Sequence, residues 1–133
     1  MTEKELHRQV CTYLKYQYPD MLFNTDLSGA FRLTIGQAKA LKKLRSNKGW
    51  PDIQICEPRN GYHGLFIELK AEDTTLLKKK MLDQNGYPMW STPHIKEQHE
   101  MIERLNELGY KAEFAIGWNE AKNIIDNYLK MKL

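Results

Sequence analysis

The sequence has little cysteine and no long apolar run, which argues against a disulfide-rich protein and against a membrane-spanning one. The two cysteines, Cys11 and Cys56, are too few for a disulfide framework, and their apolar surroundings predict buried, reduced thiols. No stretch approaches the roughly 18 apolar residues that a membrane-spanning helix needs, and the N-terminal residues do not have the pattern of a signal peptide. We therefore expect a cytoplasmic protein with no membrane partner.

Paired metal ligands of the zinc type are also absent. The four histidines have no second His or Cys at the spacing of a structural zinc site, and we expect no small-molecule cofactor. A length of 133 residues, of which 41% are hydrophobic, suits one soluble domain with its own core. The predicted organisation is a single domain over residues 1–133.

Negative charge is absent from one long segment. No carboxylate falls between Leu27 and Pro51, and a second basic run follows at residues 78–80. Basic runs are most often solvated faces, but two runs that bracket one candidate site indicate a surface for phosphates. We predict that the first run binds nucleic acid through Arg32, Lys39, Lys42, Lys43, Arg45 and Lys48.

The segment between these runs, residues 49–70, predicts a β-hairpin. Two short apolar stretches are separated by a turn that contains a proline and an Asn-Gly pair. Residues two apart on a strand share a face, so Glu68 and Lys70 project together, and antiparallel pairing can bring Asp52 beside them. Such charges are commonly solvated, but the second strand is apolar on both faces and should be buried. Two carboxylates and an ammonium there suit an oxygen-ligated Mg²⁺ near an activated water.

The same residues carry a resemblance to a known family. Gly-Trp-Pro-Asp ending at Asp52 and Ile-Glu-Leu-Lys ending at Lys70 resemble the PD-(D/E)xK nucleases, and within them the VRR-NUC family, including its stand-alone phage and bacterial members. The resemblance covers most of the chain and implies a restriction-endonuclease-like fold and the hydrolysis of DNA. If the protein is of the phage type, it would act in the host cytoplasm. It implies that Asp52, Glu68 and the carbonyl of Leu69 bind Mg²⁺ or Mn²⁺, while Lys70 orients or deprotonates the attacking water. Whether one or two metal ions act stays open.

An amphipathic helix is predicted over residues 2–18, capped by Thr2 with Glu5 at the capping-box position. Glu3 lies three residues before Leu6, on the face that should point inward. The resemblance implies that a glutamate of the first helix approaches the metal, and Glu3 fits that place better than Glu5.

A later helix is predicted from Thr92-Pro93 to Leu108, with Gly109 as its C-cap. Gln98 falls within its apolar stripe, where a buried amide must find hydrogen-bond partners. A glutamine bonded to nearby backbone is one explanation. The resemblance implies the other: Gln98 lies against the active site and orients a metal-bound water or the lysine.

The remaining pattern predicts an α/β fold with a mixed central sheet flanked by helices, in the order αβαββαβα. A short strand is expected within residues 21–25, a loop over 26–29, a helix from Thr34 to about Leu44, a strand over 112–116 and a helix over about 119–130. Residues 71–93 have no clear period, although Leu76, Leu77, Met81, Met89 and Trp90 exceed what a solvated loop needs. We expect this segment or the last helix to form a homodimer contact. The alternative is that the segment covers the chain's own core.

These observations predict a metal-dependent DNA endonuclease, selective for branched, flap or four-way-junction DNA. A chain of this size leaves little room for a separate recognition domain, which weighs against a sequence-specific restriction or homing nuclease. A nucleic-acid-binding protein with an inactive motif is the remaining alternative.

Overall fold

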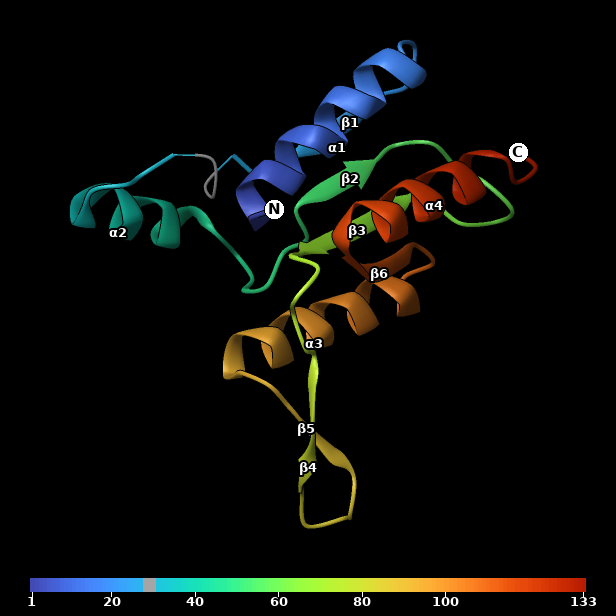
Figure 1. Cartoon of the computed structure of the whole chain (residues 1–133). Coiled ribbons are helices and arrows are strands. Elements are labelled where there is room, and N and C mark those ends of the chain that lie inside the picture. The colour runs from blue at the N-terminus through green and yellow to red at the C-terminus, as the bar shows by residue number, and fades with distance from the viewer. Residues whose placement is uncertain (28–30) are drawn as a thin grey trace.

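The computed structural model describes residues 1–27 and 31–133 and has a mixed four-stranded sheet with helices on both faces (Figure 1). The strand order is β1-β2-β3-β6, in which β1, β2 and β3 are antiparallel neighbours and β3 and β6 run parallel. Every residue of the central β3 is buried. The strands are β1 (Phe23–Thr25), β2 (Ile53–Ile55), β3 (Leu65–Lys70) and β6 (Lys111–Ile116).

The predicted hairpin of residues 49–70 is present as β2 and β3, with Ile53 opposite Ile67. Side chains alternate between the two faces of β3. On one face Ile67 and Leu69 pack with α1 (Glu3–Gln17) and α4 (Gly117–Leu129). On the other face Phe66 packs with α3 (Pro93–Glu107). The chain therefore forms three layers, with β3 in the middle layer.

Threonine caps fix where three of the helices begin. Thr2 and Thr34 each form a capping box with the residue three positions later, and Thr92 caps α3 with a proline in its first turn. Strands β3 and β6, which precede and follow α3 in the sequence, pair in parallel, so the sheet is mixed as predicted. Leu108, the last residue of the predicted helix, is the C-cap and is 65% exposed, because the chain leaves the helix there.

Residues 71–93 contain an antiparallel hairpin that the predicted element order lacks: β4 (Leu77–Leu82) and β5 (Pro88–Trp90). Almost all of its side chains are exposed, so the sequence shows no alternation of buried and exposed residues there. The hairpin projects away from the sheet (Figure 1), and the alternative that this segment covers the chain's own core is wrong. Its base is held by Trp90, whose ring lies 4.2 Å from that of His99 on α3.

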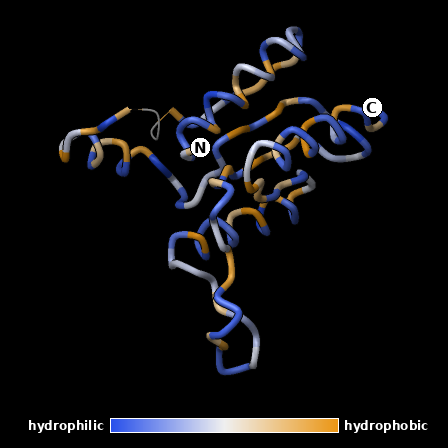
Figure 2. The backbone as a smooth tube through the Cα atoms, viewed as in Figure 1, coloured by the Kyte–Doolittle hydropathy of each residue, from blue (hydrophilic) through white to orange (hydrophobic). Residues whose placement is uncertain are grey.

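A second projection is α2 (Ile35–Leu44), which formed as predicted but has no buried residue. Figure 2 shows hydrophobic and hydrophilic residues alternating along it. Ile35 is 79% exposed and Leu44 83% exposed. We call α2 and the β4–β5 hairpin the two arms.

Three smaller expectations complete the comparison. Cys11 is half-buried as a free thiol, but Cys56 is exposed, so the expected burial is wrong for Cys56. The loop predicted over residues 26–29 falls partly on residues 28–30, which lie outside the described residues. No helix in the described part of the chain is long and apolar enough to cross a membrane.

Candidate active site at the carboxyl end of β3

Three charged residues meet where β3 ends. Glu68 and Lys70 belong to β3 and are only 3% and 5% exposed. Asp52 precedes β2, and the antiparallel register brings it across to β3, where its Oδ2 accepts a 2.8 Å hydrogen bond from the backbone N–H of Leu69. The structure thus brings together Asp52, Glu68, Leu69 and Lys70, the four residues expected from the motif.

The segment that delivers Asp52 is held against α3 by a close backbone approach. Gly49 has φ +77°, and a Cβ there would lie 2.7 Å from the carbonyl oxygen of Glu97. Only glycine satisfies both conditions without a shift of the backbone. The next residue, Trp50, packs edge-on against Phe66 with ring centroids 5.3 Å apart. These contacts bring residues 49–52 close to the first turns of α3.

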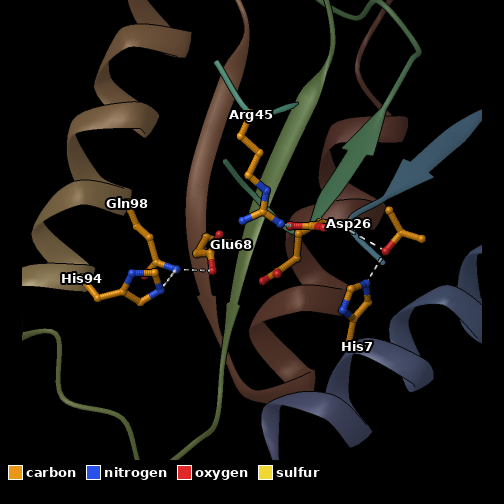
Figure 3. Close-up of polar contacts among 8 residues, drawn as sticks. His7, Asp26, Arg45, Glu68, His94 and Gln98 are labelled. Atoms are coloured by element: carbon orange, nitrogen blue, oxygen red, sulfur yellow. Dashed lines mark hydrogen bonds and ion pairs between the residues drawn. The ribbon is translucent and has the colours of Figure 1, made fainter. Parts of the chain in front are cut away.

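Gln98 reaches the site from α3. Its Nε2 donates a 2.7 Å hydrogen bond to Glu68 Oε1 and lies 3.2 Å from His94 Nε2 (Figure 3). The amide therefore holds the Glu68 carboxylate, and the expected role of Gln98 in orienting a metal-bound water or the lysine stays a prediction. Two buried oxygens, Glu68 Oε2 and Gln98 Oε1, have no hydrogen-bond partner. Unpartnered buried polar atoms are costly, and these two oxygens are therefore candidates to contact a bound ion or water.

The electrostatics of Glu68 support that conclusion. Burial and, after it, the adjacent Asp52 carboxylate raise the pKa of Glu68 from 4.5 to about 10, while the Lys70 ammonium opposes the rise. Without a bound cation, the site therefore favours the protonated form of this carboxyl group. A cation that replaces the proton would relieve the repulsion between Asp52 and Glu68.

Glu68→Gln is expected to raise the melting temperature of metal-free protein at pH 8 by about 3 °C or more. The pKa of Glu68 is higher in the folded than in the unfolded chain. The associated stability is therefore complete below about pH 4.5 and is lost as the pH rises toward about 10. Glutamine cannot ionise, so the advantage of the variant should shrink to nothing near pH 4.5. Thermal unfolding in chelator across this range measures it.

Glu113→Gln on the neighbouring strand β6 is the matched control, because Glu113 is half-buried and pairs with Lys111 at 3.3 Å. A large fall in the melting temperature of Glu68→Gln at pH 8 would instead identify Glu68 as the partner of a structural ion pair with Lys70.

The two glutamates at the start of α1 have different contacts. Glu3 Oε1 lies 4.0 Å from Lys70 Nζ, and half of the Glu3 side chain is exposed. Glu5 is occupied by the capping box, where its Oε2 accepts a 2.8 Å hydrogen bond from the N–H of Thr2. Of the two, Glu3 is the glutamate that reaches the site.

A cavity of about 210 Å³ opens at this cluster, and several of its residues were not recognised from the sequence. Arg45, expected only as a DNA contact, pairs with Asp26 at 3.4 Å and points toward the site in the view of Figure 3. His94 lies four residues before Gln98, a helical spacing that could have revealed it. The lining residues are Glu3, Asp26, Arg45, Asn47, Gly49, Trp50, Asp52, Glu68, His94 and Gln98.

Within residues 1–27 and 31–133, no three His, Cys, Asp or Glu side chains form a ready-made metal site. The donors that fit a hard divalent cation are the carboxylate oxygens of Asp52 and Glu68, with the backbone beside them. Glu68 Oε2, buried without a hydrogen-bond donor, is the atom that such a cation would satisfy.

The predicted DNA-binding residues are all exposed. Lys39, Lys42 and Lys43 lie on α2, and Arg45 and Lys48 lie between α2 and the site. The second basic run, Lys78–Lys80, lies on β4 and is exposed as well. Each arm thus carries one of the two basic runs.

No protein-family model and no curated protein matches the chain. A solved structure called "VRR_NUC domain protein" is similar over 98% of this chain and 89% of its own, with 27% sequence identity and a TM-score of 0.62. The restriction-endonuclease-like α/β architecture expected from the sequence is confirmed: the chain shares its fold with a VRR_NUC domain protein.

Proposed function

We propose that the chain, as one nuclease domain of the PD-(D/E)xK type, is a metal-dependent DNA endonuclease. One observation carries the proposal: at the end of a fully buried strand, two adjacent carboxylates face a lysine, and one buried carboxylate oxygen has no donor. The similarity to a protein whose name denotes a nuclease domain supports the same chemistry.

Each residue has a role in hydrolysis. Asp52, Glu68 and the carbonyl of Leu69 would hold Mg²⁺, with Mn²⁺ able to replace it. The ion supplies a water of lowered pKa and neutralises negative charge on the phosphate. Lys70 donates hydrogen bonds from its ammonium to orient the attacking water, and Glu3 holds that ammonium at 4.0 Å. Gln98 fixes the Glu68 carboxylate through the 2.7 Å hydrogen bond.

DNA is the proposed substrate, and branched DNA its preferred form. The two arms attach directly beside the site: α2 ends at Leu44, eight residues before Asp52, and β4 begins at Leu77, seven residues after Lys70. They project from the body in different directions (Figure 1) and both carry exposed lysines. Diverging basic arms fit duplex segments that diverge at a flap or junction better than one straight duplex.

The test is a panel of labelled DNA substrates, namely duplex, flap, splayed and four-way-junction DNA, incubated with Mg²⁺, Mn²⁺ or chelator. We expect cleavage only with metal, and fastest on a branched substrate. Binding without cleavage under every metal condition would contradict nuclease activity and identify a nucleic-acid-binding protein. Fastest cleavage at one sequence in straight duplex would contradict structure selectivity.

We also propose a homodimer, since one site cuts one strand and symmetric cutting of a junction needs two sites related by a two-fold axis. The exposed apolar residues of the β4–β5 hairpin, Met81 at 52% and Met89 at 42%, support a contact there. Light scattering at micromolar concentration is expected to give twice the chain mass of 15.7 kDa. Met81→Glu with Met89→Glu should shift the mass to the monomer, whereas Tyr16→Glu, an exposed site on α1, should not. A wild-type monomer that still cuts junctions in pairs would contradict the dimer.

A further inference from the structure

The exposed face of α1 carries a row of cations that the sequence analysis did not single out. Lys4, Arg8 and Lys15 are spaced by four and seven residues, which places them within about 40° of one another around a helix of 3.6 residues per turn. The buried side chains Leu6, Val10 and Leu14 occupy the other side of α1. All three cations are exposed, and none of them forms an ion pair with a carboxylate among the described residues.

The row borders a cavity rather than a flat surface. A pocket of about 220 Å³ lies between this face of α1 and the chain that follows β1. Thr25 forms the floor: its hydroxyl contacts His7 and donates a 3.2 Å hydrogen bond to the carbonyl of Asp52. This hydrogen bond connects the pocket directly to Asp52, the residue that precedes β2. Its lining residues are Lys4, His7, Arg8, Cys11, Lys15, Thr25, Asp26 and Leu27.

This pocket adjoins the candidate active site. Asp26 lines both cavities, and Glu3, at the active site, is the immediate neighbour of Lys4 in α1. On the opposite side, Arg45, Asn47, Gly49 and His94 are shared between the active-site cavity and a third cavity of about 480 Å³, which Lys42 and Lys48 also line. Asp26, the carboxylate that lines both the α1 pocket and the active-site cavity, is paired with Arg45. Cations thus flank the site on two sides, on α1 and between α2 and α3.

We infer that the exposed face of α1 is a second phosphate-binding track, and that one DNA strand runs from Lys15, Arg8 and Lys4 across Asp52 and Glu68 to Arg45 and Lys48. The inference rests on the proposed nuclease function, because it assigns the path of the same substrate. Lys4 and Lys15 are eleven residues apart in the sequence, which corresponds to about 16 Å along the helix. That length matches roughly five nucleotide steps of one strand in duplex DNA.

The track predicts a large, sequence-independent loss of affinity when its charge is removed. Lys4→Gln, Arg8→Gln and Lys15→Gln are combined in one variant, and DNA binding is measured at several salt concentrations on a branched substrate. An added Asp52→Asn substitution keeps the DNA uncut. The loss of three phosphate contacts should make the slope of log Kobs against log[salt] shallower by about 2–3. Binding at 50 mM salt should weaken about tenfold or more.

The matched control is Lys111→Gln, Lys130→Gln and Lys132→Gln, which removes the same charge near the end of the sheet opposite the candidate site. Lys111 opens β6 opposite Leu65, five residues from the carboxyl end of β3, and the carbonyl of Lys132 bonds to Asn60 in the β2–β3 loop. We expect this variant to keep nearly all of the wild-type salt slope. Thermal unfolding verifies that both variants are folded.

Each outcome bears on a separate claim. A reduced slope in the α1 variant alone, with slower cleavage at subsaturating DNA when Asp52 is present, supports the track. Equal slopes in the α1 variant and the control overturn the track while the wild type still binds and cuts DNA. A wild type that neither binds nor cuts DNA overturns the proposed function and, with it, the track.

Discussion

Asp52→Asn, Glu68→Gln and Lys70→Ala are each expected to lower the rate of DNA cleavage at least about a hundredfold while the chain stays folded. The first two changes each remove a carboxylate that is proposed to bind the metal, and the third removes the ammonium that is proposed to orient the attacking water. The three act on one reacting centre, so a double variant should be little worse than the poorest single variant. Single-turnover cleavage of a branched substrate in Mg²⁺ measures the rate, and circular dichroism verifies folding.

Lys111→Ala and Glu113→Gln are the controls for these losses. Both residues lie on β6, beside β3, and form a 3.3 Å ion pair with each other. They pair in register with Leu65 and Ile67, whose side chains lie on the face of the sheet opposite to that of Glu68. Their cleavage rates should stay near the wild-type value. Near wild-type cutting by a correctly folded Asp52, Glu68 or Lys70 variant would remove that residue from the proposed site.

Gly49→Ala is expected to destabilise the chain and to impair cleavage together. A non-glycine residue in the left-handed region costs about 1–2 kcal/mol, and at Gly49, with φ +77°, the added Cβ would also meet the Glu97 carbonyl at 2.7 Å. Helix α3 and the segment before Asp52 must then separate, which moves Asp52 away from Glu68. The free energy of unfolding from urea titration and the single-turnover rate measure the two effects.

Gly61→Ala is the control that measures the cost of the left-handed backbone conformation alone. Gly61 has φ +83° but nothing within 4 Å of the position that a Cβ would take. Gly61→Ala should be destabilised only by the cost of the left-handed conformation, and it should cut DNA at the normal rate. Equal destabilisation by the two substitutions, with cleavage intact in both, would show that the contact between residue 49 and α3 does not position Asp52.

Much of the fold could be predicted because its signals are local. Thr2, Thr34 and Thr92 cap helices through side chains that contact residues only three positions away. The β4–β5 hairpin could not be predicted in the same way. The alternation of buried and exposed side chains gives the sequences of strands and helices their periodicity. Since β4 and β5 bury almost nothing, residues 71–93 have no periodic pattern. Helix α2 could be predicted from its Thr34 cap, although it has no buried residue.

The candidate site, like the fold, could be predicted only where its signals are local. Glu68 and Lys70 could be paired from strand spacing, and the turn signals brought Asp52 to them. Asp26 could not be added, because its place depends on the pairing of β1 with β2, which brings its N–H within 2.9 Å of the Asp52 carbonyl. The contact of Gln98 with Glu68 likewise depends on how α3 crosses the sheet, a long-range packing result that no local pattern encodes.

The position of the two arms has a consequence for how such a protein can diversify. Both arms are inserted next to the residues of the proposed site, yet they contribute almost nothing to the buried core. Insertions, deletions or exchanges in α2 or the β4–β5 hairpin should therefore cost little stability. Insertions or deletions in the buried strand β3 should instead destabilise the fold. In the proposed nuclease, exchange of an arm by natural variation or engineering would therefore change which DNA is selected without altering the residues around Glu68.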